Sequence, residues 1–265
     1  VGESGITPGL AIVARDDDPL QRIYVRKKIA QCQRTGIRAV LSPLNASTST
    51  RELADRLAAL NADRAVHGIF VQWPPPEQVD SDSAIETLAL AKDVDCMHAT
   101  NLARLLLGHP SFAPAAVRAC MLLLRSSLPT LTGLHAVIAG DSNAFVRPIA
   151  HILRGENCTV TLAPRAGHDL AAICRRGDVL IAALGQPEAV RGDWIKAGAT
   201  VIDVGMNVIA DDNRRHQFVG DVKFEEASRV ARAITRVPGG VGPVTIACLL
   251  QNTLEAAKQP FGKEG

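Results

Sequence analysis

The first residues that could carry out chemistry are a tyrosine and a lysine four positions apart, Tyr24 and Lys28, within a helical pattern. Residues four apart lie on one face of a helix, so the phenol ring and the ammonium group are expected side by side. A lysine can act as an acid or a base when burial lowers its pKa. A solvated basic helix accounts for many lysine-rich runs, so the pattern alone leaves both interpretations open.

Polar residues also follow the third apolar run of the chain. Gln72 ends that run and either caps a loop or faces a ligand cleft. Asp93 and Asp95 lie near each other, with His98 behind them, so a weak metal-site interpretation competes with a plain surface turn. Spacing alone does not decide between the two.

Two glycine-containing segments look like ligand-binding turns. Residues 236–245, RVPGGVGPVT, place three glycines and two prolines before a long helical pattern. Such a loop favours close approach to a ligand at a helix N-terminus. Residues 136–150, AVIAGDSNAFVRPIA, have the apolar run, glycine and helix start of a phosphate-binding turn, but contain only one glycine. This second segment is equally typical of a cofactor site and of an ordinary connection.

Strand and helix patterns alternate along the chain and must position these residues. In the first half, strands are predicted at 9–14, 37–44 and 67–73, with helices at 18–36 and 47–63. In the second half, a helix at 115–127 precedes strands at 135–140, 158–163, 178–184, 199–205 and 232–237, and a helix at 242–259 closes the chain. The alternation predicts an α/β fold with two lobes of parallel, doubly wound sheet, which bind ligands at the carboxyl ends of their strands.

Composition limits the classes of partner. The chain has 265 residues, 47% of them hydrophobic, and a net charge of +2, so neither nucleic acid nor a membrane surface is expected. The sequence has no apolar run of the roughly 20 residues that span a bilayer, and no basic and apolar leader opens it. Its six cysteines form no C-x-x-C pair or zinc spacing. We therefore expect reduced core thiols in a cytoplasmic protein, and no metal.

Together, the ordered segments resemble the bifunctional, FolD-like methylenetetrahydrofolate dehydrogenase/methenyltetrahydrofolate cyclohydrolase family, from Pro8 to about Lys258. DPLQRIYVRKK is similar to D-P-A-S-x-x-Y-V-x-x-K, GIFVQWPPP to G-I-L-V-Q-L-P-L-P, and KDVDCMH to K-D-V-D-G-F-H. DVGMN is similar to D-V-G-I-N, VGDV is the same in the family, and VPGGVGPVT is similar to P-G-G-V-G-P-M-T. The family also carries an N-terminal helical segment that this sequence does not contain.

The resemblance implies a domain organisation and a set of partners. Residues 1–112 plus 243–265 would form the folate-binding catalytic domain, and 113–242 a Rossmann-like domain, with the final helix returning to the first lobe. The substrate would be the 5,10-methylene or 5,10-methenyl form of tetrahydrofolate. A homodimer is also implied.

The resemblance further implies roles for single residues. Lys28 would assist proton transfer and water attack at the folate-bound carbon, and Gln72 would hydrogen-bond near it. Tyr24 would pack on the pterin. Asp95 would accept hydrogen bonds from the pterin amino and ring N–H groups, which argues against a metal at this carboxylate. In addition, the loop of Pro238, Gly239 and Gly240 would close over folate and dinucleotide, and Thr245 would belong to the cofactor site.

The dinucleotide half departs from the family pattern. The family loop G-R-S-x-x-V-G-x-P is here GDSNAFVRP, which keeps Gly140, Ser142 and Pro148. Asp141 replaces the arginine that would face the extra phosphate of NADP, and a carboxylate there would repel it. Val146 replaces the second glycine, and its branched side chain would obstruct the pyrophosphate. The family C-H-S-x-T is here APRAG, in which Arg165 could supply a substitute charge.

Smaller departures lie near the folate positions. Gln21 replaces the serine of the P-A-S motif, and Cys96 replaces the glycine after Asp95. The family F-x-P-C-T-P is here FAPAAV, at residues 112–117. These changes affect the shape of the expected pocket.

Three functions compete, and the sequence favours the first, in which NADP binding is doubtful. The first is a folate-dependent one-carbon enzyme in which NADP binding and hydride transfer are weakened or lost. It would act as a cyclohydrolase, or would transfer the one-carbon unit to a second small-molecule nucleophile in the vacated nicotinamide space. The alternative is the ordinary bifunctional NADP-dependent dehydrogenase/cyclohydrolase. The third is a non-catalytic folate-binding paralogue, which the intact Tyr-Lys-Gln-Asp set disfavours.

Overall fold

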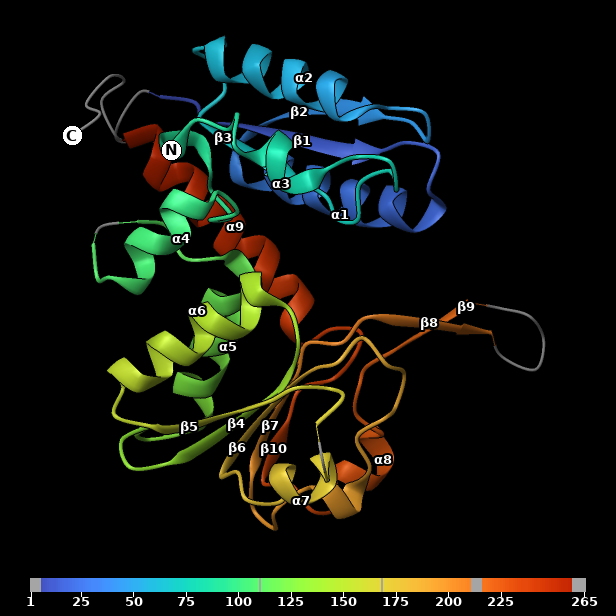
Figure 1. Cartoon of the computed structure of the whole chain (residues 1–265), viewed down its shortest axis with the longest axis vertical. Coiled ribbons are helices and arrows are strands. Elements are labelled where there is room, and N and C mark those ends of the chain that lie inside the picture. The colour runs from blue at the N-terminus through green and yellow to red at the C-terminus, as the bar shows by residue number, and fades with distance from the viewer. Residues whose placement is uncertain (1–5, 110, 168, 211–215, 259–265) are drawn as a thin grey trace. The chain divides into compact units, whose positions relative to one another are not determined.

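The computed structural model describes residues 6–109, 111–167, 169–210 and 216–258 (Figure 1). The chain forms two compact units, one of Val1–Ala115 with Ile246–Gly265 and the other of Ala116–Thr245. Both units contain a parallel sheet covered by helices. The predicted fold class, two α/β lobes with a final helix that returns to the first, is therefore confirmed.

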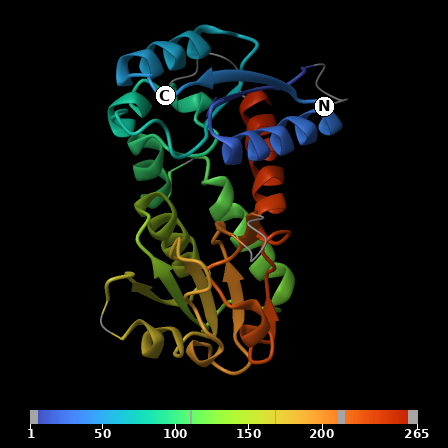
Figure 2. The ribbon, with the colours of Figure 1, turned by 90° about the vertical axis from the view of Figure 1, so that its right-hand side faces the viewer.

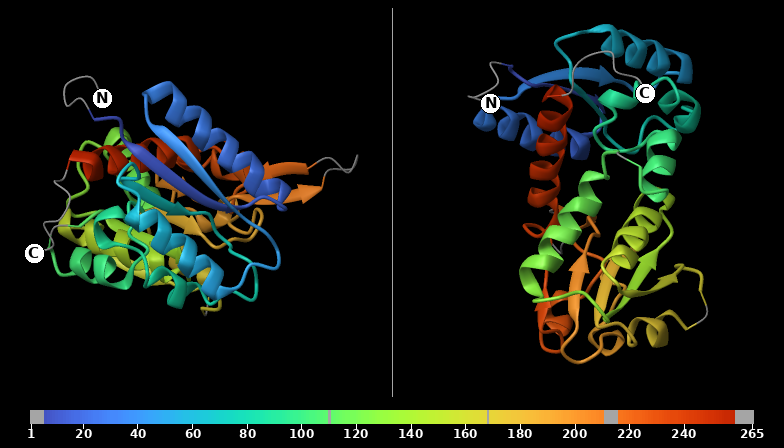
Figure 3. Two further views of the ribbon diagram at one scale, coloured as in Figure 1. Left: turned by 90° about the horizontal axis from the view of Figure 1, so that it is seen from above. Right: turned by 90° about the vertical axis from the view of Figure 1, so that its left-hand side faces the viewer.

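The first unit has a three-stranded parallel sheet in the order β2-β1-β3 (Figure 3). Its strands are β1 (Gly9–Arg15), β2 (Arg38–Leu44) and β3 (Gly68–Val71). Helix α1 (Pro19–Thr35) covers one face and α2 (Thr50–Ala62) the other. Alternate residues of the strands face opposite sides, so Ala11 and Val13 pack in one cluster with Leu53 and Leu57 of α2.

Local signals set the ends of these two helices. The Asp18 side chain accepts hydrogen bonds from the first turn of α1, which ends at Gly36 in the left-handed conformation with φ of 73°. Ser49 and Glu52 form a reciprocal capping box at the start of α2. The helix predicted at 18–36 is confirmed, with residues 18 and 36 as its two caps.

The rest of the first unit comes from the segment after β3 and from the end of the chain. It consists of α3 (Ser81–Ile85), the 3₁₀ turn η1 (Leu90–Lys92), α4 (Ala99–Leu106) and the later part of α9 (Val241–Lys258). Buried Asn252 of α9 donates hydrogen bonds to the carbonyl groups of Val94 (2.7 Å) and Ala113 (3.0 Å). These bonds fix α9 beside the segment that carries Asp95.

The second unit has a five-stranded parallel sheet in the order β10-β7-β6-β4-β5 (Figure 2). Its strands are β4 (His135–Gly140), β5 (Thr159–Ala163), β6 (Val179–Ala183), β7 (Thr200–Asp203) and β10 (Ala233–Ile234). Helices α5 (Ala115–Ser127) and α6 (Asn143–Gly155) lie on one side of the sheet, and α7 (Leu170–Cys174) and α8 (Phe224–Ala227) on the other (Figure 1). The strand order reverses beside β4, where doubly wound folds bind ligands.

Three further features of the chain are a hairpin, its cysteine thiols and the length of its helices. The antiparallel pair β8 (Asn207–Ala210) and β9 (His216–Val219) was not predicted, because its short strands resemble connecting segments in the sequence. All six cysteines are free and buried, as expected. None of the helices that the structure describes is long and apolar enough to cross a membrane.

Candidate active site

The structure brings Lys28 and Gln72 into direct contact. The Lys28 side chain is 8% exposed on α1, and its Nζ donates a 2.8 Å hydrogen bond to Gln72 Oε1, just after β3. The same Nζ lies 4.7 Å from the centre of the Phe70 ring and 6.0 Å from the centre of the Tyr24 ring. Phe70 is two residues before Gln72, so both lie on the α1 side of β3. The predicted Tyr24–Lys28 pairing is thus observed, and Phe70 completes the surroundings of the amine.

Burial changes the acid–base properties of this amine. It lowers the pKa of Lys28 from 10.5 to about 8, and the opposing charge of Asp95 raises that pKa by a smaller amount. Burial likewise raises the pKa of Asp95 to about 6, despite the hydrogen bond that it accepts and the Lys28 charge. Both groups therefore titrate close to neutral pH, as expected of an acid–base pair at a reaction site.

The two aspartates of the 92–96 segment have different surroundings. Asp93 is fully buried and accepts hydrogen bonds from the backbone of Met97 (2.9 Å) and His98 (3.0 Å) and from the Asn101 side chain (2.9 Å). Asp95 accepts one 2.8 Å hydrogen bond, on Oδ1, from the first backbone N–H of α5. Within the described ranges, no group of three His, Cys, Asp or Glu side chains could hold a metal ion. Asp93 holds the loop that presents Asp95.

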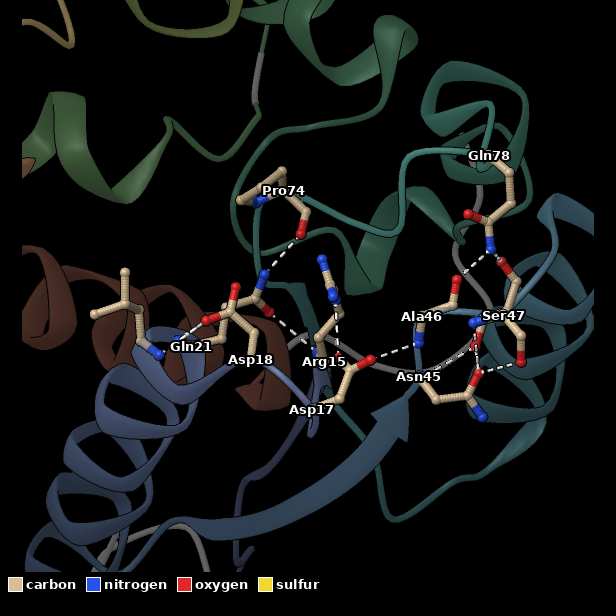
Figure 4. A network of polar contacts seen from close by, with 11 residues as sticks. Arg15, Asp17, Asp18, Gln21, Asn45, Ala46, Ser47, Pro74 and Gln78 are labelled. Atoms are coloured by element: carbon tan, nitrogen blue, oxygen red, sulfur yellow. Dashed lines mark hydrogen bonds and ion pairs between the residues drawn. The ribbon is translucent and has the colours of Figure 1, made fainter.

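Gln21 holds the loop that carries Gln72 (Figure 4). Its side chain is 3% exposed, accepts a 3.0 Å hydrogen bond from Arg15 N and donates one of 2.6 Å to the Pro74 carbonyl. It thereby joins the end of β1 to the segment after β3. In the sequence, Gln21 stands out only as a departure from the family serine. Its position seven residues before Lys28, on the same helical face, was the signal that could have identified it.

The altered turn of the second unit lies at the carboxyl end of β4. Gly140 is opposite Ala183 of β6, and a side chain on Gly140 would come within 2.4 Å of the Ala183 carbonyl oxygen. Ser142 is the N-cap of α6 but makes no side-chain capping bond. Val146 is 6% exposed, so its side chain is packed in the interior. Among the described residues, no hydrogen bond reaches the backbone N–H groups of Asn143 and Ala144.

Asp141 and Arg165 connect the ends of β4 and β5. Asp141 Oδ1 accepts a 3.0 Å hydrogen bond from Arg165 N, and its Oδ2 lies 3.2 Å from Arg165 Nε. The two side chains are 44% and 49% exposed. They form a surface ion pair at the edge of the sheet where nucleotides bind in this fold.

Two buried carboxylates that the sequence did not identify organise the neighbouring strand ends. Asp221 accepts hydrogen bonds from the backbone N–H groups of residues 184–186 and from the Asn207 side chain. Asp203 accepts three more from Gly205, Asp221 and the following residue. The pair fixes the loops after β6 and β7. Both aspartates lie within family motifs, DVGMN and VGDV, but the motifs alone indicate no role for them.

The remaining predicted residues belong to the second unit. Gly239 has a φ of 110°, which favours glycine, and a side chain on Gly240 would come within 2.5 Å of the Arg236 carbonyl oxygen. The bond before Pro238 is cis. The Thr245 hydroxyl donates to the Val241 carbonyl within α9 (3.0 Å). The glycines are therefore required by the shape of the loop itself.

The first unit holds a buried lysine–glutamine pair and a carboxylate, and the second unit is a doubly wound sheet. These features are typical of a two-domain α/β enzyme. The chain belongs to the tetrahydrofolate dehydrogenase/cyclohydrolase family. Residues 1–95 match the model of its catalytic domain, and residues 114–261 that of its NAD(P)-binding domain. It is thus an enzyme of tetrahydrofolate one-carbon metabolism.

Several known proteins resemble the chain over nearly its whole length. Bifunctional protein FolD 2 of Paracoccus denitrificans is 48% identical over 97% of this chain and 85% of its own length. Bifunctional protein FolD of Cereibacter sphaeroides is 49% identical over 97% of this chain and 87% of its own length. The crystal structure of a Trypanosoma brucei methylenetetrahydrofolate dehydrogenase-cyclohydrolase, complexed with NADP cofactor and inhibitor, has a TM-score of 0.91 at 37% identity and covers 97% of this chain and 88% of its own. The Campylobacter jejuni enzyme has a TM-score of 0.89 at 38% identity, over 96% and 89%.

Proposed function

We propose that the chain is an ordinary bifunctional enzyme that oxidises 5,10-methylenetetrahydrofolate and hydrolyses 5,10-methenyltetrahydrofolate. The observation that carries the proposal is the buried Lys28 amine, hydrogen-bonded to Gln72 with its pKa near 8. Relatives named bifunctional support both activities, and they favour this function over the expected loss of hydride transfer. A separate one-carbon transfer to a second nucleophile has no support in the described residues.

The hydrolytic step needs a base close to the folate carbon. In 5,10-methenyltetrahydrofolate the bridging carbon lies between two nitrogens and carries part of a positive charge, so it accepts an attacking water. The neutral Lys28 amine takes a proton from that water, and Gln72 fixes the direction of the amine. When the adduct collapses, its hydroxyl loses a proton, the departing nitrogen takes one from the Lys28 ammonium, and one carbon–nitrogen bond breaks. A formyl group remains on the other nitrogen.

The first unit also offers groups that could orient the substrate. Tyr24 presents an aromatic ring beside the amine, suited to stacking on the flat pterin. One Asp95 oxygen is held by α5, and the carboxylate can accept further hydrogen bonds from pterin N–H groups. These assignments rest on the contacts within the first unit and on the family resemblance.

The second unit fits a dinucleotide. The backbone N–H groups at the start of α6 have no partner among the described residues, and an arginine lies at the neighbouring strand end. Because Val146 is buried, its side chain does not cover this helix start. Ser142, Asn143, Ala144 and Arg165 would hold NADP, which would supply the acceptor for the hydride of the methylene carbon.

One paired assay tests both activities. Absorbance of methenyltetrahydrofolate is followed without dinucleotide, and NADP and NAD reduction is then followed with methylenetetrahydrofolate. The proposal requires hydrolysis above the buffer rate and reduction of at least one dinucleotide. Lys28→Met should abolish hydrolysis, whereas Lys27→Met, at an exposed neighbour, should not. Hydrolysis without any dinucleotide reduction would restore the dehydrogenase-deficient alternative.

A further inference from the structure

The ends of β4 and β5 carry a pair of opposite charges whose geometry determines what each residue can bind. Paired strand positions continue from Ala139 and Ala163, so Asp141 and Arg165 follow in equivalent places at one edge of the sheet. Asp141 uses one oxygen for Arg165 N and the other for Arg165 Nε. The carboxylate is therefore engaged twice by the same residue.

The backbone of Arg165 is fixed as well. Gly167 N donates a 2.8 Å hydrogen bond to the Pro164 carbonyl, which closes a tight turn around Arg165. A side chain on Gly167 would come within 2.9 Å of that carbonyl oxygen, so the turn excludes larger residues. With its main chain and Nε held, the guanidinium of Arg165 is restrained on one edge. Its two terminal nitrogens form no hydrogen bond with any described residue.

Position in the sheet indicates which part of a dinucleotide would meet this arginine. In doubly wound folds the pyrophosphate lies at the helix after the first strand, here α6 after β4. The residue that ends the second strand meets the adenosine ribose: an acid binds the 2′-hydroxyl of NAD, and an arginine accommodates the 2′-phosphate of NADP. Residues 164–167, directly after β5, contain Arg165 and no acid.

We propose that Arg165 recognises the ribose 2′-phosphate and that Asp141 moderates this recognition. The free edge of the guanidinium offers two parallel donors, the geometry that suits a phosphate. Asp141 holds the opposite edge but brings a negative charge close to the phosphate. The chain thus prefers NADP to NAD, but less strongly than it would with an unpaired Arg165. This inference rests on the proposed dehydrogenase function.

The two residues predict opposite effects on binding. Arg165→Gln should weaken NADP binding on the order of ten- to a hundredfold, the usual effect of losing hydrogen bonds to a charged group, and leave NAD binding unchanged. Asp141→Asn should strengthen NADP binding by roughly a few-fold, because exposed charges interact weakly. Added salt should weaken NADP binding more than NAD binding.

Isothermal titration calorimetry of the full chain with NADP and with NAD tests this, independently of turnover. Arg154→Ala, an exposed arginine at the far end of α6, is the matched control and should leave both affinities unchanged. An unchanged ratio of NADP to NAD affinity in Arg165→Gln, or weaker NADP binding in Asp141→Asn, would overturn the inference alone. Absence of binding by either dinucleotide to the unaltered protein would overturn the proposed dehydrogenase function as well.

Discussion

Replacement of Gln72 should move the pH dependence of hydrolysis, because Gln72 accepts the hydrogen bond of the Lys28 amine at 2.8 Å. The lowering of the Lys28 pKa from 10.5 to about 8 corresponds to about 3 kcal/mol against the charged form. At pH 7 about a tenth of the amine is then neutral, compared with about three in ten thousand for an ordinary lysine. The neutral fraction, and with it the rate, should rise with pH up to a plateau above 8.

Gln72→Leu removes the acceptor of this hydrogen bond. A hydrogen bond to a charged group is worth roughly 1.5–3 kcal/mol. The neutral amine also donates to Gln72, more weakly, so the replacement destabilises the charged form relative to the neutral form by about 1.4 kcal/mol, which is one pKa unit. The rising limb of the rate should then move to lower pH by about one pH unit. Gln72→Glu places a carboxylate at the same contact and should move the limb to higher pH.

The assay is kcat/KM for loss of methenyltetrahydrofolate absorbance between pH 6 and 9.5, corrected for buffer hydrolysis. Carbon NMR of labelled lysines, with the Lys28→Met variant to assign the signal, measures the titration of the amine directly. If the rate rises with pH over the same range in the unaltered protein, Gln72→Leu and Gln72→Glu, then Gln72 does not affect the pKa of Lys28. A Lys28 signal that titrates near 10.5 would refute the effect of burial.

Three further outcomes are expected. Because the folded chain holds Lys28 with a lowered pKa, the unfolded chain binds more protons than the folded chain between pH 8 and 10.5. The free energy of unfolding should therefore rise with pH in that window, relative to Lys28→Met. The same pH dependence of the urea-unfolding free energy in both proteins would contradict this. Gln21→Ala removes two hydrogen bonds that join the end of β1 to the segment after β3, so it should lose about 1–3 kcal/mol in urea unfolding and reduce hydrolysis, whereas exposed Gln33→Ala should do neither. Asp221→Asn places an amide N–H₂ among the backbone donors of residues 184–186, which should disturb the loop after β6. Dinucleotide affinity measured by calorimetry should therefore fall while hydrolysis persists. Unchanged affinity would exclude a role of Asp221 in positioning this loop for the dinucleotide.

Much of the fold could be predicted from the sequence because its elements are set by local rules. Asp18 and Gly36 mark the ends of α1 through hydrogen bonds to nearby backbone groups. The β strands of both sheets are short apolar runs between helical patterns, which is typical of parallel strands buried on both faces. The β8–β9 hairpin was not predicted because its strands have only four residues each, too few to show a clear periodicity in the sequence.

The sequence by itself determined the family and the residue types at the folate positions, because motifs such as DPLQRIYVRKK and VPGGVGPVT are specific in order and spacing. The tertiary structure decided the burial, protonation and pairing of these residues. Lys28 has a pKa near 8 because the folded chain buries it, and burial depends on residues that are far apart in the sequence. In the same way, Asp141 looked like a simple charge reversal in the sequence. Only the pairing of β4 with β5 places Arg165 against it and makes the two one charged unit.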